Sequence, residues 1–185
     1  MNNTNKQEDT TKDSVRRNSQ ATIHLVEGPV GAGKSTYAAQ LAVQYSAPRF
    51  NLDEWMVTLF SADRPETGFM PWYAERKDRC IEQIWNLSSD LIESEQSAVL
   101  ELGLIQREDR RDLYKRVDDM EISLVVYVLD VPKEVRQQRV RQRNTQRSGT
   151  FRMHVSDKIF ELANSMWQAP DEVECRERNI QYVNY

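Results

Sequence analysis

Short apolar runs alternate with longer amphipathic stretches along most of the sequence. Buried strands are predicted for residues 21–27, 48–52, 97–105, 121–130 and 179–183. Helices are predicted for residues 34–45, 72–94, 106–120 and 155–170, and for a further segment that begins after Pro132. The run 121–130 is almost wholly aliphatic, as expected of a parallel strand that is covered on both faces. The alternation predicts an α/β fold of three layers, α/β/α, around a five-stranded parallel sheet.

The carboxyl-terminal segment completes this pattern. Apolar residues recur at helical spacing in the last predicted helix, and the candidates for burial are Ile159, Phe160, Leu162, Ala163 and Met166. Pro170 ends that helix because it cannot continue the backbone hydrogen bonding. Residues 179–183 then supply the last strand.

The length and composition are those of one domain with a polar tail. The chain of 185 residues suffices for a single domain at 21–185, whereas residues 1–20 carry too little apolar surface to offset the entropy of ordering. A net charge of −4 argues against general nucleic-acid binding. Cys80 and Cys175 lack a paired spacing, and no apolar run approaches about 18 residues. We therefore expect a cytoplasmic protein with reduced thiols and no membrane segment.

One motif is specific enough to predict chemistry. Residues 28–36, GPVGAGKST, match the pattern G-x-x-x-x-G-K-[ST] in full and lie between a predicted strand and a predicted helix. Glycines let the backbone wrap closely around a polyphosphate and turn its N–H groups inward. The amino-terminal end of the following helix adds unpaired amides and the positive end of its dipole. The motif and its context predict a nucleoside-triphosphate site.

This site can be assigned residue by residue. The nucleotide-binding residues of the loop are expected to be Gly28, Pro29, Val30, Gly31, Ala32, Gly33, Lys34, Ser35 and Thr36. Lys34 is expected to reach the terminal phosphate oxygens and so to take part in catalysis, and Ser35 is expected to ligate Mg²⁺. Because the guanine-reading N-K-x-D signature is absent, the expected cofactors are ATP and Mg²⁺.

Acidic residues follow two of the predicted strands. In an open parallel sheet, ligands bind beyond the carboxyl ends of the strands, so Asp53 and Glu101 should face the same crevice as the loop. Asp53 is the candidate general base, which takes a proton from an acceptor hydroxyl, or a residue that holds Mg²⁺ through a water. Glu54 competes for that role, or is instead an exposed acid that complements a helix dipole. Glu101 is a candidate either for the Mg²⁺ shell or for acceptor binding.

Residues 55–75 form a candidate acceptor-pocket segment. Their aromatic side chains are interleaved with Gly and Pro, and they are Trp55, Phe60, Phe69, Trp72 and Tyr73. Such a segment suits a mobile cover over a small-molecule pocket. An insertion that packs these aromatic side chains on the body of the domain is the alternative.

Basic residues gather in one stretch, residues 133–152, which holds seven basic side chains and one acid. Within it, Arg136, Arg139, Arg143 and Arg147 recur at offsets of three and four, so they share one helix face. Like charges at this spacing repel one another unless an anion neutralises them. We interpret the segment as a lid that closes over ATP. A solvated helix and a nucleic-acid-binding arm are the alternatives.

The order of these parts resembles the small phosphate-loop kinases. The shared parts are the loop, an Asp after the second strand, an acid after the third, the stretch LDVPKEVRQQRVRQRN, and a closing helix with Pro and a final strand. Residues 22–183 are similar to the branch that contains bacterial AAA-type ATP-binding kinases, zeta toxins, chloramphenicol phosphotransferase and the kinase domain of polynucleotide kinase. The resemblance implies a nucleoside-kinase-like P-loop NTPase fold. It also implies that Asp53 is the catalytic base and that Arg139 and Arg143 are catalytic lid arginines that clamp the nucleotide.

The expected function is ATP-dependent transfer of the γ-phosphoryl group to a hydroxyl of a small-molecule acceptor. One alternative is an ATP-binding switch or slow ATPase that has no acceptor. Another is a nucleotide or polynucleotide 5′-kinase that uses the basic helix. Because acceptor specificity depends on the shape of a pocket and not on a transferable motif, the sequence leaves the acceptor open, and the oligomeric state with it.

Overall fold

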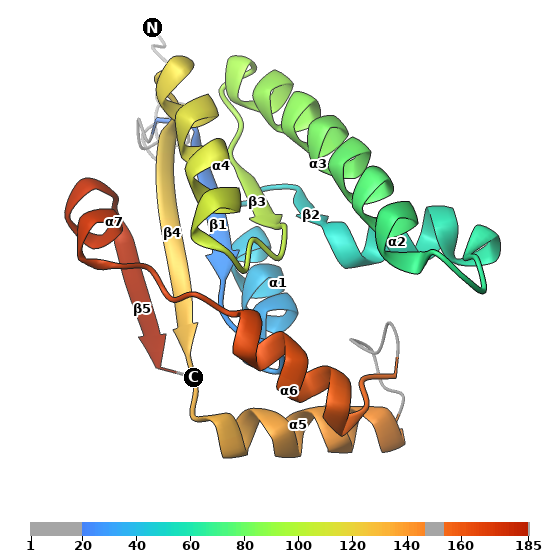
Figure 1. The fold of residues 1–185 in the computed structure, drawn as a ribbon. Helices are drawn as coiled ribbons and strands as arrows, with labels where there is room; N and C mark the ends of the chain where they lie inside the picture. Colours follow the sequence, from blue (N-terminus) through green and yellow to red (C-terminus); the bar gives the residue numbers. More distant parts are fainter. Residues whose placement is uncertain (1–19, 147–153, 185) are drawn as a thin grey trace, which may run out of the picture.

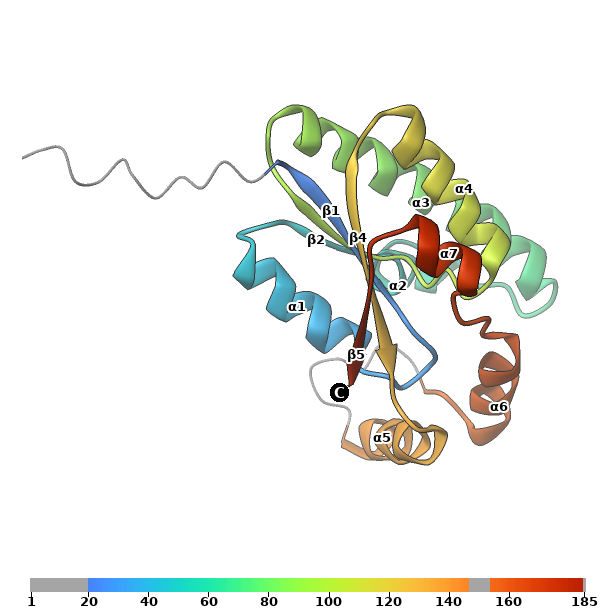
Figure 2. The same cartoon turned by 90° about the vertical axis from the view of Figure 1, so that its left-hand side faces the viewer.

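The computed structural model describes residues 20–146 and 154–184 and has three layers (Figures 1 and 2). The strands are β1 (Thr22–Glu27), β2 (Arg49–Asn51), β3 (Ala98–Glu101), β4 (Ser123–Asp130) and β5 (Ile180–Asn184). The helices are α1 (Lys34–Gln44), α2 (Leu52–Phe60), the short 3₁₀ turn η1 (Ser61–Asp63), α3 (Phe69–Glu93), α4 (Arg107–Asp119), α5 (Lys133–Gln146), α6 (Asp157–Met166) and α7 (Glu172–Glu177). The predicted tail up to residue 19 and the far part of the predicted lid, including Arg147, lie outside the described residues.

The strands form one sheet in the order β2-β3-β1-β4-β5, and every neighbouring pair is parallel. The prediction of a five-stranded parallel sheet is therefore confirmed. All carboxyl ends meet at one edge of the sheet, where the chain leaves β1 for α1 (Figure 1). Segments that follow different strands are thus brought together at this edge.

Apolar side chains cover both faces of the sheet, as the continuous apolar runs predict. On β1, Ile23 and Leu25 are fully buried against α3 and α4, whereas Val26 is fully buried against α1. Figure 2 shows the same division, with α1 on one side of the sheet and α3 and α4 on the other. The two-residue period of a strand therefore gives each face its own core.

The segment after β2 differs from the prediction because a helix begins earlier than expected. The side chain of Asn51 accepts a hydrogen bond from the N–H of Glu54 at 2.8 Å and so caps α2. The predicted strand 48–52 is therefore only three residues long, and Leu52 already belongs to the helix. Asp53 lies in the first turn of α2 and not at the end of a strand.

Most of residues 55–75 are helical, and their role as a cover over an acceptor pocket stays a prediction. Helix α2 continues to Phe60, and α3 begins at Phe69. Four of the five aromatic side chains pack in a small core between these two helices. This core comprises Leu52, Trp55, Met56, Phe60, Trp72, Tyr73, Cys80 and Ile81.

The core assignment in the last predicted helix is mostly wrong. Phe160 is fully buried, but Ile159, Leu162 and Met166 are 48%, 61% and 38% exposed. Helix α6 lies beside α5 at one end of the molecule (Figure 1), so only one of its faces meets protein. That face carries Phe160 into a small cluster with Val140 and Val155.

A buried ion pair joins α4 to α7. Arg110 is fully buried, and its Nε and Nη2 donate to the two carboxylate oxygens of Glu174 at 2.8 and 2.9 Å. Its Nη1 donates to the backbone oxygen of Gln168 at 2.8 Å. Two charges removed from water are tolerated only with such complete pairing.

Replacing one partner of this pair should be strongly destabilising. We expect Glu174→Gln to lower the free energy of unfolding by about 3–5 kcal/mol, because it leaves the Arg110 charge buried and uncompensated. The matched control is Asp118→Asn, which removes the largely exposed partner of Arg178 and should cost less than about 1 kcal/mol. Urea denaturation of both variants measures the difference, and equal losses would contradict the assignment.

Candidate active site

The phosphate loop joins β1 to α1 at the carboxyl edge of the sheet. Gly28, Gly31 and Gly33 have positive φ angles of 146°, 79° and 101°, which side chains disfavour. Gly33 precedes α1 without any side-chain cap, so the first amides of the helix are not occupied by a capping side chain. The ammonium of Lys34 donates to the backbone oxygens of Gly28 at 2.8 Å and Pro29 at 3.2 Å. The loop therefore has the backbone geometry that the motif predicts.

The carboxylate of Glu101 connects the loop to the neighbouring strand and helix. Its Oε1 accepts a hydrogen bond from the hydroxyl of Ser35 at 2.8 Å, and its Oε2 accepts one from the Asn51 amide. Arg49 lies 3.7 Å from the same Oε2. Burial raises the pKa of Glu101, while the charge of Lys34 opposes that shift. The structure thus brings Ser35 and Glu101 together beside the loop.

This pair of oxygen donors fits Mg²⁺. A hydroxyl and a carboxylate within hydrogen-bonding distance of each other are hard ligands that one ion can reach together. Within the described residues, no group of three or more His, Cys, Asp or Glu could hold a metal ion by itself. A magnesium ion bound here would therefore have to complete its shell with phosphate oxygens and water, as magnesium at nucleotide sites does.

Asp53 is exposed in the first turn of α2 and interacts with charged and polar groups of three other elements. Burial lowers the pKa of Arg143 on α5, and the charge of Asp53 opposes that shift. Burial and then the charge of Asp53 raise the pKa of Tyr73 on α3 to about 12. Asp53 also adds to the raised pKa of Glu101 after the effect of burial. Asp53 therefore lies in the electrostatic environment of Glu101, and so of the loop.

Glu54, the competing acid, has a different environment. Its carboxylate lies 2.7 Å from Nη2 of Arg49, and its backbone N–H is bound by the Asn51 side chain. Glu54 thus supports the start of α2. This arrangement favours Asp53 over Glu54 as the acid available to a ligand.

The first half of α5 is bonded directly to the loop. Arg136 is buried, and its Nη1 donates to the oxygen of Val30 at 3.0 Å. Arg139 donates to the oxygen of Ala32 at 3.2 Å. A Cβ added to Gly31 would come within 2.7 Å of the backbone oxygen of Arg136, so the contact is close. Arg136, grouped in the sequence with the lid arginines, is a structural residue that holds the loop.

Arg143 lies farther along α5, and its pKa is lowered by burial while the charge of Asp53 opposes that shift. Its Nε is buried and has no hydrogen-bond partner within residues 20–146 and 154–184. A buried donor without a protein partner is costly unless a water or a ligand satisfies it. The structure therefore brings Arg143, Asp53, Glu101, Ser35 and the loop to one edge of the sheet.

Glu27 is an acidic residue of this edge that the sequence patterns did not single out. It ends β1 immediately before the loop, is fully buried, and neither carboxylate oxygen has a hydrogen-bond partner in the described part of the chain. Burial raises its pKa to about 8, although the charges of Lys34 and Arg110 act in the opposite direction. In the sequence, Glu27 is marked only by being a single acid at the end of an apolar run.

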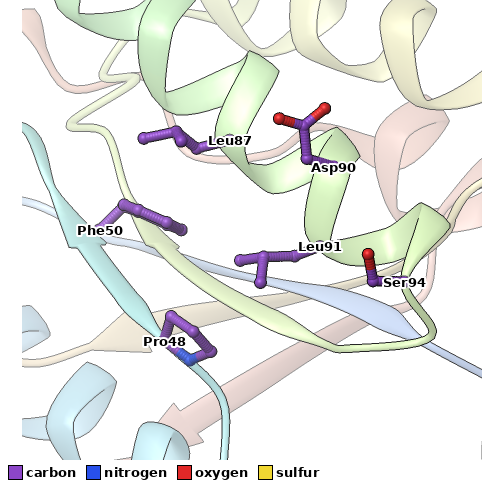
Figure 3. A pocket seen from close by; sticks show the side chains of 6 residues that line it. All are labelled: Pro48, Phe50, Leu87, Asp90, Leu91 and Ser94. Carbon is purple, nitrogen blue, oxygen red and sulfur yellow. The ribbon is translucent and has the colours of Figure 1, made fainter.

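A separate cavity of about 300 Å³ lies between β2 and α3 (Figure 3). Its lining residues are Pro48, Phe50, Leu87, Asp90, Leu91 and Ser94. None of them belongs to the loop or to α5, and α3 contributes from its carboxyl-terminal part. This cavity is therefore not part of the candidate site.

The sequence matches one known family. A family model described as an AAA domain matches residues 23–170. Because the match spans most of the chain, the protein belongs to this family, and its architecture is that of a kinase-like P-loop NTPase. The family implies that the loop binds ATP. No curated protein matches the sequence.

Three solved structures illustrate the similarity of fold. A putative kinase from Chloroflexus aurantiacus J-10-fl has a TM-score of 0.67 at 16% identity, covering 89% of this chain and 85% of that one. Kti12 from Chaetomium thermophilum, in complex with ADP-AlF3, has a TM-score of 0.63 at 12% identity, covering 88% and 89%. A gluconokinase from Sinorhizobium meliloti 1021 has a TM-score of 0.56 at 18% identity, covering 89% and 82%. At such identities the likeness shows the fold alone.

Crossing a membrane requires a long helix that is apolar throughout. None of the helices in the described part of the chain combines the length and the apolar character that crossing a membrane requires.

Adding a side chain at Gly31 should push the loop away from α5. We expect Gly31→Ala to lower the free energy of unfolding by about 2–4 kcal/mol, because it adds a steric overlap to a strained backbone. The control is Gly68→Ala, where φ is +70° but no atom lies within 4 Å, so only the backbone strain of about 1–2 kcal/mol remains. Chemical denaturation of both variants gives the comparison. A loss at Gly31 no larger than at Gly68 would contradict the close packing.

Glu27 should make stability depend on pH. The folded state keeps its proton up to about pH 8, whereas the unfolded chain releases it near the usual value of 4.5. Its contribution is therefore complete below pH 4.5 and is lost as the pH rises to about 8. We expect Glu27→Gln to remove a decrease on the order of a few kcal/mol over this range. Denaturation at several pH values measures it, with the exposed Glu93→Gln as the control whose slope should stay unchanged.

Proposed function

We propose that this protein is an ATP-dependent phosphotransferase that moves the γ-phosphoryl group of ATP to a hydroxyl of a small-molecule acceptor. The loop from Gly28 to Thr36 holds the phosphates of ATP, and Ser35 with Glu101 holds Mg²⁺. Asp53 is the general base. Arg139 and Arg143 neutralise charge on the transferring group.

One observation carries the proposal. Asp53 interacts electrostatically with Glu101, and Glu101 in turn accepts a hydrogen bond from Ser35 of the loop at 2.8 Å. A carboxylate is thus available beside the place where the loop presents the end of a triphosphate. An acid at this position suits the general base of a phosphotransferase.

The chemistry follows from these positions. The acceptor oxygen forms a bond to the γ-phosphorus while the bond from that phosphorus to the β,γ-bridging oxygen breaks, and ADP leaves. The proton of the acceptor hydroxyl passes to the carboxylate of Asp53. Mg²⁺ held by Ser35 and Glu101 would neutralise negative charge on the phosphates. The unpaired Nε of Arg143 supplies a donor on the side of Asp53, where charge develops during the transfer.

The slow ATPase without an acceptor is the alternative that the same loop would allow. The two functions differ in the fate of the labelled phosphate. Incubation of the protein with γ-labelled ATP and a metabolite extract yields a labelled organic product only if an acceptor is phosphorylated. The kinase assignment requires that product. If labelled inorganic phosphate is the only product, the protein is an ATPase without an acceptor.

Removing the base should abolish transfer but spare binding. We expect Asp53→Asn to lower kcat by about 10²- to 10⁴-fold, because no base remains to take the proton from the substrate hydroxyl. The dissociation constant of ATP, measured by calorimetry, should stay within roughly threefold, since Asp53 does not form part of the loop. Asp63→Asn, an exposed acid in the 3₁₀ turn that follows α2, is the control and should change neither quantity. Full turnover by Asp53→Asn would remove Asp53 from this role.

A further inference from the structure

The two edges of the sheet differ in how they are protected. In the order β2-β3-β1-β4-β5, only β2 and β5 have a single neighbouring strand among the described residues. The outer backbone groups of such a strand can pair with another chain, so edge strands are commonly kept short or charged. Strand β2 has both features, because it is only three residues long and begins with Arg49, which lies 2.7 Å from Glu54.

Strand β5 has neither feature. It extends over five residues, and its sequence IQYVN contains no charged residue and no proline. Isoleucine, tyrosine and valine favour extended backbone. Figures 1 and 2 show β5 at the outer edge of the sheet, with β4 on one side and no further strand of the described chain on the other. Strand β5 is therefore the edge that is open to pairing.

The hydrogen bonds between β4 and β5 show which backbone groups point outward. The N–H of Val126 on β4 donates to the backbone oxygen of Asn179 at 2.9 Å. Alternate residues of a strand face the same neighbour, so the backbone groups of Gln181 and Val183 are also directed towards β4. The N–H and C=O of Tyr182 therefore point away from the sheet, towards solvent.

Uncharged side chains lie beside this edge. The side chain of Tyr182 is 52% exposed, and its hydroxyl lies 3.6 Å from the Sγ of Cys175 on α7. Val173 on the same helix is 37% exposed. The charge of Arg178, which precedes β5, is already engaged, because two of its nitrogens donate to the carboxylate of Asp118 at 2.6 Å. The edge thus combines an uncharged strand with an exposed aromatic ring.

We propose that two copies of this protein associate through β5, antiparallel to each other across a two-fold axis, so that their sheets become continuous. A strand that meets its own copy across such an axis must run antiparallel to it, and the same segment then contacts itself. With Tyr182 at the centre, the two Tyr182 residues exchange N–H···O=C bonds, and their rings lie side by side on one face.

The composition of β5 favours a second copy as the occupant of the edge. Each chain has a net charge of −4, yet two β5 strands carry no charge and so meet no like-charge repulsion where they pair. The central residue is an aromatic one, and aromatic pairs directly opposite each other stabilise antiparallel strands. This association is independent of the proposed function, because no residue of the candidate active site belongs to β5.

The first experiment measures association of the full-length protein by analytical ultracentrifugation from about 1 µM to about 100 µM. Pairing along one strand buries less surface than a stable dimer commonly needs, so we expect a reversible dimer with Kd in roughly the micromolar range. A monomer at every concentration would overturn the proposal. Species larger than the dimer would also overturn it, because a two-fold contact closes on itself.

The second experiment changes the edge itself. Tyr182→Pro removes the outward N–H and leaves the ladder with β4, which is the kind of edge position that tolerates proline. Tyr182→Lys keeps the N–H and places two ammonium groups opposite each other. We expect each variant to weaken association by at least about tenfold.

Val43→Lys is the matched control, since Val43 on α1 is 82% exposed and the substitution adds the same charge away from β5. Its association should equal that of the wild type. Circular dichroism establishes that the variants are folded. A dimer that persists in a folded Tyr182 variant, or that is lost in Val43→Lys, would show that the contact lies elsewhere.

Amide hydrogen exchange, followed by NMR, identifies what occupies the edge. Exchange of the Tyr182 N–H should become slower as the protein concentration rises through Kd, because the bond forms only between copies. Slow exchange at every concentration would mean that another part of the same chain covers β5. Fast exchange at every concentration would mean that β5 stays unpaired, and either result would overturn the proposal.

Discussion

The candidate site depends on one buried carboxylate, that of Glu101. It accepts hydrogen bonds from Ser35 of the loop and from Asn51, which also caps α2. A buried carboxylate is stable only when such donors satisfy it, so the three groups fix one another. Because Asn51 starts the helix that carries Asp53, the same contact sets the position of the proposed base relative to the loop. The distance between the two functional segments is thus determined by the end of β3.

A second constraint comes from α5, which is part of the cradle as well as a candidate lid. Arg136 and Arg139 bind the backbone oxygens of Val30 and Ala32, so the start of this helix is fixed on the loop. Arg143, about two turns beyond Arg136, has a buried Nε without a partner among the described residues. The repulsion expected among these arginines is relieved in part by backbone carbonyls. The helix therefore combines structural arginines at its beginning with an arginine that remains available for an anion.

Sequence patterns predicted the sheet well but did not show which faces of the helices meet other parts of the domain. The strands β1, β3 and β4 follow from apolar runs that are mostly buried on both faces, a property of each run alone. Residues 55–75 contain Gly and Pro, yet they fold mostly as helices, because α2 and α3 bury their aromatic side chains against each other. In α6, the apolar spacing is helical, but the body of the domain meets only the face of Phe160. Periodicity identifies a helix and does not say how many neighbours cover it.

The sequence by itself determined the phosphate loop, because its function resides in backbone geometry that Gly28, Gly31 and Gly33 encode locally. It also supplied the family to which the chain belongs, since motif order is a property of the sequence. Only the tertiary structure decided which charged residues serve the fold and which face the site. Arg110 and Arg136 are buried structural residues, and Glu27 is a buried acid beside the loop. Their roles depend on partners that are dozens of residues away, and the free energy of a charge is set by whatever surrounds it after folding.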